Sequence, residues 1–186
     1  MVLTYTTAQT DEEIEQILAL QQANLPQNIS AEEMAQQGFV TVQHTFELLK
    51  RMNEIGAHVI AKDGDQVVAY ALTMTTDFRH DIPILLPMFE MIDAQMWKGK
   101  PLSEWKYYIM GQICVGKAYR AQGVFDGLYA QMKKEYADVF DMVITEVSAR
   151  NQRSLRAHQR VGFEALHTYA APDGEVWELI YWDFGR

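Results

Sequence analysis

The chain has 186 residues, a hydrophobic content of 48% and a formal charge of −9. This length suits one substantial core, so we expect residues 1–186 to form a single domain. The negative charge argues against nucleic acid as a partner, because binding to a phosphate backbone needs clustered Lys and Arg. The single cysteine, Cys114, allows neither an internal disulfide nor a cysteine-rich zinc site, and no metal is expected.

The N-terminal residues carry acids where a secretory signal would carry bases and an apolar stretch, so we expect a cytoplasmic protein. The most apolar run, residues 82–91, is interrupted by Pro83, Pro87 and Glu90. It is too short to span a bilayer, and we expect no membrane association.

The N-terminal third predicts a strand followed by helices. Val2–Thr6 has the composition of a strand, and Thr10 and Glu13 have the spacing of a capping box at the start of a helix. A second capping box is predicted at Ser30–Glu33. The apolar spacing from Phe46 onward predicts another helix that ends at Gly56.

A hairpin and a less regular segment follow. Residues 57–60 and 67–74 are rich in strand-forming residues and flank Lys62–Asp65, which is a turn sequence. Residues 77–104 contain prolines and a cluster of Met and Phe, and most resemble a helical insertion. We interpret this insertion as a lid or pocket wall, and its apolar side chains would suit a homodimer contact equally well.

The second half predicts a strand, a helix and a strand, and then a short helix and a closing strand pair. The ranges are 105–115, 122–136, 140–147, 154–159, 165–169 and 175–182, with a turn at 172–174. The first three form a βαβ unit. The expected architecture is therefore a mixed α/β or α+β sheet with helices packed on its faces.

The junction between the strand that ends at Val115 and the next helix has the features of an anion site. The first N–H groups of a helix have no intrahelical acceptor, and the helix dipole is positive there. Lys117 and Arg120 add positive charge, and Gly123 would let a phosphate approach the backbone. The same pattern is also compatible with a plain loop before a helix.

This segment resembles the acyl-CoA signature of the GNAT acyltransferases, Q/R-x-x-G-x-G/A. Arg120, Ala121, Gln122 and Gly123 match its first four positions and Val124 suits the fifth. Phe125 departs from it, because the family has Gly or Ala there. A second family landmark is similar to residues 151–163: an Asn, a short helix and a closing Gly-Phe. In it, His158 stands where many members have a tyrosine near the CoA sulfur.

The resemblance implies a GNAT-like mixed, mostly antiparallel sheet with helices on both faces and a diverging central strand pair. It also implies acetyl-CoA as the acyl donor, with no metal. The implied cofactor-binding residues are Ile113, Cys114, Val115, Arg120, Ala121, Gln122, Gly123, Val124, Phe125, Asn151, Ser154 and His158. Gly111 fits this reading as a point of close backbone approach, and a packing glycine explains it equally well.

The implied activity is N-acetyl transfer to a primary amine of a small molecule or peptide, by direct attack in a ternary complex. A primary alkyl amine is nearly all protonated at pH 7, so a base must take its proton. Glu146 is the first candidate, and Asp77 or His80 would serve if the insertion covers the site. His158, as an imidazolium, would protonate the departing thiolate.

Three alternatives remain open at this point. Cys114 could form an acyl-cysteine intermediate, although a lone strand cysteine is more often a buried apolar residue. Phe125 and the missing tyrosine are compatible with a non-catalytic acyl-CoA-binding or regulatory module. A nucleotide-binding protein could use the same anion site, but the sequence has no Walker lysine or dinucleotide glycine pattern.

Overall fold

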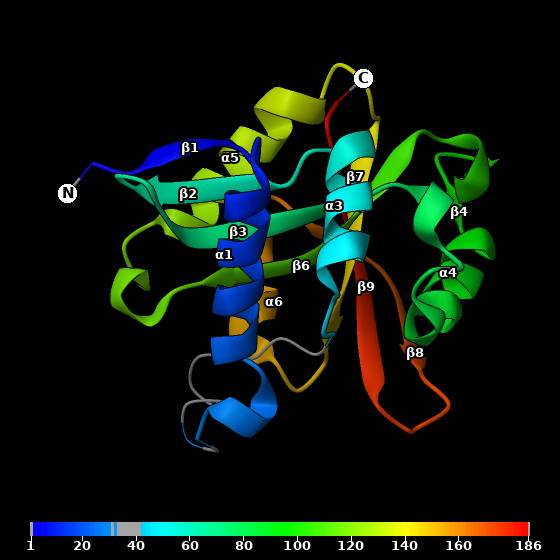
Figure 1. Cartoon of the computed structure of the whole chain (residues 1–186). Helices are drawn as coiled ribbons and strands as arrows, with labels where there is room; N and C mark the ends of the chain where they lie inside the picture. The colour runs from blue at the N-terminus through cyan, green and yellow to red at the C-terminus, as the bar shows by residue number, and fades with distance from the viewer. Residues whose placement is uncertain (1, 31, 33–41, 186) are drawn as a thin grey trace. The chain divides into compact units, whose positions relative to one another are not determined.

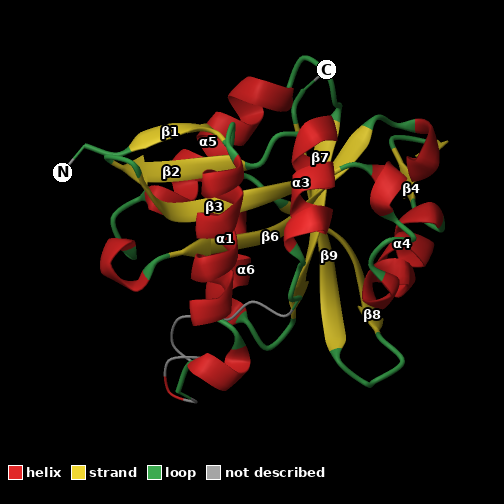
Figure 2. Cartoon of the chain, in the orientation of Figure 1, coloured by secondary structure: helices red, strands yellow, loops and turns green. Residues whose placement is uncertain are grey.

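The computed structural model describes residues 2–30, 32 and 42–185. The chain divides into two compact units, residues 1–74 with 110–135 and residues 75–109 with 136–186. Figure 2 distinguishes the helices and strands that form them. The capping box predicted at Ser30–Glu33 includes Ala31 and Glu33, which lie outside the described residues. No helix within the described part of the chain is long and apolar enough to cross a bilayer.

The first unit is built on a sheet with the strand order β1-β2-β3-β6. These strands are β1 (Thr4–Thr7), β2 (Val59–Asp63), β3 (Gln66–Met74) and the end of β6 (Tyr107–Val115). β1 pairs with β2, and β2 with β3, in antiparallel register. The predicted hairpin is confirmed, and its turn consists of Gly64 and Asp65.

Helices cover both faces of this sheet. They are α1 (Asp11–Ala23), α3 (Phe46–Ile55) and α5 (Val124–Tyr136). Figure 1 shows α1 in front of the strands of this unit and α5 behind them. The predicted capping box at the start of α1 is confirmed: the Thr10 hydroxyl accepts from the Glu13 N–H, and the Glu13 carboxylate accepts from the Thr10 N–H, both at 3.2 Å.

A buried polar network fixes the end of β6 within this unit. The Gln112 Oε1 accepts hydrogen bonds from the Tyr70 hydroxyl at 2.6 Å and from the Gln21 Nε2 at 2.7 Å. The Gln112 Nε2 donates to the Val42 carbonyl at 2.8 Å, and the Gln21 Oε1 accepts from the His44 N–H at 2.8 Å. β6 is thereby tied to α1, to β3 and to the segment that precedes α3.

The second unit contains the strand order β6-β7-β9-β8. The further strands are β7 (Met142–Ser148), β8 (Glu164–Ala170) and β9 (Val176–Asp183). β7 and β8 each pair with β9 in antiparallel register, whereas β6 and β7 are parallel. The predicted βαβ unit and the mixed, mostly antiparallel sheet are confirmed.

The parallel pairing between β6 and β7 covers three residue pairs. β6 pairs with β7 from Tyr107–Ile109 opposite Met142–Ile144. Among the described residues, no further β6–β7 pair follows, although β6 continues to Val115 and β7 to Ser148. The parallel pairing of β6 with β7 thus lies at the beginning of both strands, within the second unit.

The insertion is less helical than expected. It contains α4 (Leu86–Asp93), a small hairpin of β4 (Met96–Trp97) and β5 (Lys100–Pro101), and 3₁₀ turns at 76–78, 83–85 and 102–104. Lys98 and Gly99 form the turn of the hairpin with positive φ angles of 46° and 80°. The Trp97 ring packs edge-on against Tyr181 of β9 at 5.7 Å, so the insertion covers part of one face of the β7–β9 sheet.

The other face of β7–β9 carries α6 (Gln152–Val161). Successive strand residues point to opposite faces, so Trp182 lies on the face opposite to Tyr181. The Phe163 ring, directly after α6, lies 5.9 Å from the Trp182 ring. Gly162 has φ +121°, and a Cβ there would lie 2.9 Å from the Trp182 indole nitrogen. The Gly-Phe landmark is therefore explained by packing against β9.

Candidate active site

The loop between β6 and α5 in the first unit has a backbone suited to anion binding. Ala121 and Gly123 have left-handed φ angles of 59° and 77°. The Gly123 carbonyl accepts from the Gly127 N–H at 3.0 Å, so α5 begins directly after Gly123, two residues later than predicted. A Cβ added at Gly123 would meet no atom within 4 Å. Open space thus lies beside the N–H groups of the first helical turn, which have no intrahelical acceptor.

Arg120 binds this loop to the end of β6 and to the end of α1 through hydrogen bonds. Its Nε donates to the Val115 carbonyl at 3.0 Å, and its Nη2 donates to the Asn24 Oδ1 at 2.6 Å. Gln122 donates from its Nε2 to the Ala118 carbonyl at 2.8 Å. The side chain that was predicted to supply phosphate charge therefore also holds the loop against the ends of β6 and α1.

The residue that departs from the signature is accommodated within α5. The Phe125 ring is half-buried and lies 5.1 Å from the Tyr129 ring, one turn further along the helix. Val124 beside it is buried in the core. Asp126 lies near Tyr5 of β1, where its charge adds to burial in raising the pKa of the Tyr5 hydroxyl. The bulky side chain at position 125 is thus part of the packing of α5.

The end of β6 places Ile113 and Val115 in half-buried positions and Cys114 in a buried one. Burial raises the pKa of the Cys114 thiol to about 12. Because the thiolate is the nucleophilic form, this environment does not favour an acyl-cysteine intermediate at neutral pH. A Cβ at Gly111 would lie at ordinary contact distances of 3.8 and 3.9 Å, so packing within the first unit does not require glycine there.

Glu146 of β7 is the best-placed candidate base in the second unit. It lies opposite Leu179 of β9, on the face that also carries Tyr181. The Tyr169 hydroxyl donates a short hydrogen bond to the Glu146 Oε2. Burial raises the pKa of the Glu146 carboxyl to about 7, and the bond from Tyr169 opposes that rise. A carboxyl group with this pKa both accepts and releases protons near neutral pH.

His158 has surroundings that differ from the prediction. Its side chain is 1% exposed, and burial lowers the pKa of the imidazole to about 4. Its Nδ1 lies 2.8 Å from the Ser154 carbonyl, which can only accept, so Nδ1 carries a proton and the neutral ring has its lone pair on Nε2. At neutral pH this neutral state does not favour the imidazolium acid predicted for His158, and a catalytic role of His158 stays a prediction.

Asn151 and Ser154 also have local structural roles. The Asn151 Oδ1 accepts from the Ser154 N–H at 3.2 Å and so caps α6. The Ser154 hydroxyl lies 3.3 Å from the His158 Nδ1. Together these contacts order the first turns of α6.

The predicted acid and base are not brought together within the second unit. The His158 ring packs edge-on against Phe163 at 5.0 Å, and Phe163 packs on Trp182, so His158 lies on the α6 face of β7–β9. Glu146 lies on the opposite face, which the insertion partly covers.

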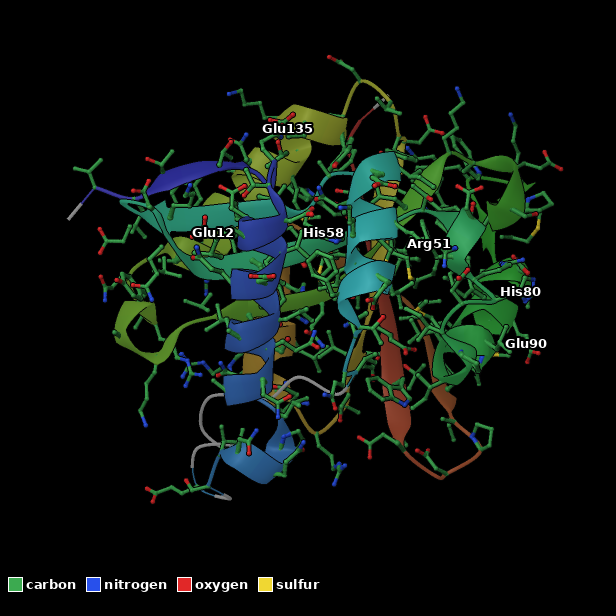
Figure 3. The ribbon with its side chains drawn as sticks, viewed as in Figure 1. Glu12, Arg51, His58, His80, Glu90 and Glu135 are labelled. Carbon is green, nitrogen blue, oxygen red and sulfur yellow. The ribbon has the colours of Figure 1, made fainter. Side chains whose placement is uncertain are left out.

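The two alternative bases lie on the insertion. Asp77 is exposed, and its carboxylate accepts from the Thr75 hydroxyl at 2.7 Å. His80, labelled in Figure 3, is also exposed. Neither has the burial that distinguishes Glu146.

Tyr169, the hydrogen-bond partner of Glu146, was not among the residues predicted from the sequence. It pairs with Trp177 of β9, and β7 lies on the other side of β9. The register between β8 and β9 shifts at Ala165–His167, so residue spacing alone does not predict that Tyr169 reaches Glu146. Among the residues that the structure describes, no three His, Cys, Asp or Glu side chains are grouped as a metal site would require.

Comparison with known proteins gives a consistent family match. The family model described as the acetyltransferase (GNAT) family matches residues 15–163. No curated protein sequence matches significantly.

Solved structures resemble the fold at low sequence identity. The ribosomal-protein-S18-alanine N-acetyltransferase from Escherichia coli has a TM-score of 0.64 and 13% identity, covering 100% of this chain and 96% of that one. Arabidopsis thaliana NAA60 in complex with acetyl-CoA has a TM-score of 0.66 and 13% identity, covering 98% and 99%. The putative acetyltransferase yncA from Salmonella typhimurium with acetyl-CoA has a TM-score of 0.65 and 10% identity, covering 100% and 96%. These likenesses concern the fold.

Proposed function

The chain belongs to the GNAT acetyltransferase family, and on that premise we propose that it transfers an acetyl group from acetyl-CoA to a primary amine by direct attack. The observation that carries the proposal is the half-buried Glu146 carboxyl, whose burial raises its pKa to about 7. Such a group suits the proton transfer that amine acetylation requires, the removal of a proton from the acceptor nitrogen.

The loop of the first unit supports the choice of acyl donor. The left-handed residues Ala121 and Gly123, the open space beside Gly123 and the helix start at Val124 fit the diphosphate of a CoA ester. Arg120 keeps a positive charge beside the loop. Acetyl-CoA, when bound, supplies an activated thioester, so the protein itself need only bind, orient and deprotonate.

Glu146 would accept the proton of the attacking amine, directly or through one water molecule. As the C–N bond forms, the C–S bond of the thioester would break, and the departing CoA thiolate would take up a proton from solvent. Its carboxylate is the form that acts as a base, and it predominates above pH 7 because the pKa is about 7. His158, neutral and buried, would help to hold α6 against β9 through Phe163. The acceptor is proposed to be a primary amine of a small molecule or of a peptide. One structurally similar protein is named as an N-acetyltransferase of an alanine of ribosomal protein S18.

Acetyl-CoA should raise the melting temperature of the protein. A ligand that binds only the native state adds about 2.7 kcal/mol of stability at a hundredfold excess over its dissociation constant. We expect this shift with acetyl-CoA and with CoA, and a much smaller one with ATP at the same concentration, measured by differential scanning fluorimetry. Equal shifts with ATP would favour a nucleotide-binding protein, and no shift with any of the three would contradict the proposed donor site.

A further inference from the structure

We propose that Tyr169 is a positioning residue for the base: its hydroxyl holds one oxygen of the Glu146 carboxylate and leaves the other oxygen to take the proton of the acceptor amine. This inference rests on the proposed function, because it gives Glu146 its role. It assigns to β8 a part in the reaction that the sequence pattern did not indicate.

The strand register places the two side chains on one face. Tyr169 pairs with Trp177, and Trp177 in turn pairs with Ser148, two residues beyond Glu146 on β7. Directly paired residues share a face, so Tyr169 and Glu146 both lie on the face opposite to α6. The tyrosine reaches diagonally across β9, and its hydroxyl donates to the Glu146 Oε2.

The contact uses one carboxylate oxygen. Within the described residues, the Tyr169 bond to Oε2 is the hydrogen bond that the structure gives to the Glu146 side chain. A carboxylate held at one oxygen has a defined orientation, and its second oxygen retains the lone pairs that a general base needs. The arrangement resembles the general pattern in which a catalytic base is oriented by a third group.

The neighbouring charged groups on this face have other partners. On β9, the Asp183 carboxylate accepts from Lys98 of the insertion at 2.8 Å. On the loop before β9, Glu175 is bound by Arg150 at 2.5 Å. On β8, Glu164 accepts from the Tyr181 hydroxyl at 3.0 Å.

Among the described residues of this face, few other polar side chains remain that could shift the pKa of the Glu146 carboxyl. His167 of β8 is exposed and pairs with Leu179, and Ser148 of β7 donates to Glu175. The causes of the raised pKa of Glu146 are accordingly burial, which raises it, and the bond from Tyr169, which lowers it. Removing the hydroxyl should therefore raise the pKa further, since burial would remain without the donor that stabilises the charged form.

The test is the variant Tyr169→Phe, which keeps the ring and removes the donor. Carboxyl carbons of glutamate are titrated by NMR in protein labelled at glutamate, and the Glu146 signal is identified by its loss in Glu146→Gln. We expect the pKa of Glu146 to rise by about one unit in Tyr169→Phe. The acid limb of the pH profile of kcat/KM should move by the same amount, so that kcat/KM at pH 7 falls about fivefold and recovers near pH 9.

The matched control is Tyr181→Phe, which removes a tyrosine hydroxyl on the same face that donates to Glu164 instead. Tyr181→Phe should leave the pKa of Glu146 unchanged. An unshifted titration in Tyr169→Phe overturns this inference whatever the activity. A shifted titration in a protein that acetylates no amine overturns the proposed function instead, and leaves the contact between Tyr169 and Glu146 established.

Discussion

Glu146→Gln is expected to lower kcat/KM for acetyl transfer by about 10²- to 10⁴-fold, the range for loss of one general base. The amide cannot accept the amine proton, yet it has nearly the same shape and can still accept a hydrogen bond from Tyr169. In the parent protein, kcat/KM should fall as the pH falls below about 7, because protonation of Glu146 removes the base. Initial rates between pH 5.5 and pH 9 measure both effects.

The control for this variant is Glu178→Gln on β9. Glu178 pairs with Val147 and lies on the opposite face of the sheet from Glu146, where its carboxylate accepts from Thr168. It should retain nearly the full rate. The assignment of the base is wrong if Glu146→Gln has the same kcat/KM as the parent protein. It is also wrong if Glu178→Gln loses as much activity as Glu146→Gln.

The stability of Glu146→Gln can also be predicted, and the expected direction of the change differs from that of a folding defect. The pKa of Glu146 is raised in the folded state, so folding binds its proton more tightly, and this contribution is lost as the pH rises from about 4.5 through about 7. Glu146→Gln removes the buried charge and should therefore be at least as stable as the parent protein at pH 8. A catalytic defect accompanied by lower stability at pH 8 would indicate a folding defect.

Gly123→Ala is expected to weaken acetyl-CoA binding by about ten- to a hundredfold. Its Cβ would occupy the open space beside the first N–H groups of α5, and a few charge-assisted hydrogen bonds to a diphosphate account for a loss of that size. The left-handed φ of 77° also strains any residue with a Cβ, so some stability will be lost as well. Isothermal titration calorimetry with acetyl-CoA measures the binding effect.

The control variant Gly99→Ala separates the loss of acetyl-CoA affinity from the loss of stability. Gly99 has a similar φ of 80°, and a Cβ there also meets nothing within 4 Å, but it lies in the β4–β5 turn of the insertion. It should lose comparable stability and keep its affinity for acetyl-CoA. Equal affinities in the two variants would show that the loop before α5 does not hold the diphosphate.

Much of the fold could be predicted because its signals are local. The capping box at Thr10 and the turn at Gly64 depend on neighbouring residues alone, and both are present. The β4–β5 hairpin was missed because its strands have two residues each, too few to show a period of two. The start of α5 was placed too early, since composition does not reveal the left-handed backbone at Ala121.

The chemistry of the candidate site was harder to predict from the sequence, because it depends on tertiary structure. Glu146 could be named from its strand, but its pKa depends on burial by segments far away in the sequence. Tyr169 could not be named, because the irregular register of β8 decides which residue it reaches. The acid role of His158 was assigned from its position in a motif, whereas its protonation state depends on burial and on the Ser154 carbonyl.

The most direct test of the central proposal is release of free CoA thiol from acetyl-CoA in the presence of a broad panel of primary amines, including peptides with free N-termini. We expect thiol release that depends on both protein and amine and rises from pH 6 to pH 8, with mass spectrometry finding the acetyl group on the amine. Binding of acetyl-CoA without thiol release above background for any amine would contradict the account. The chain would then be the non-catalytic acyl-CoA-binding or regulatory module.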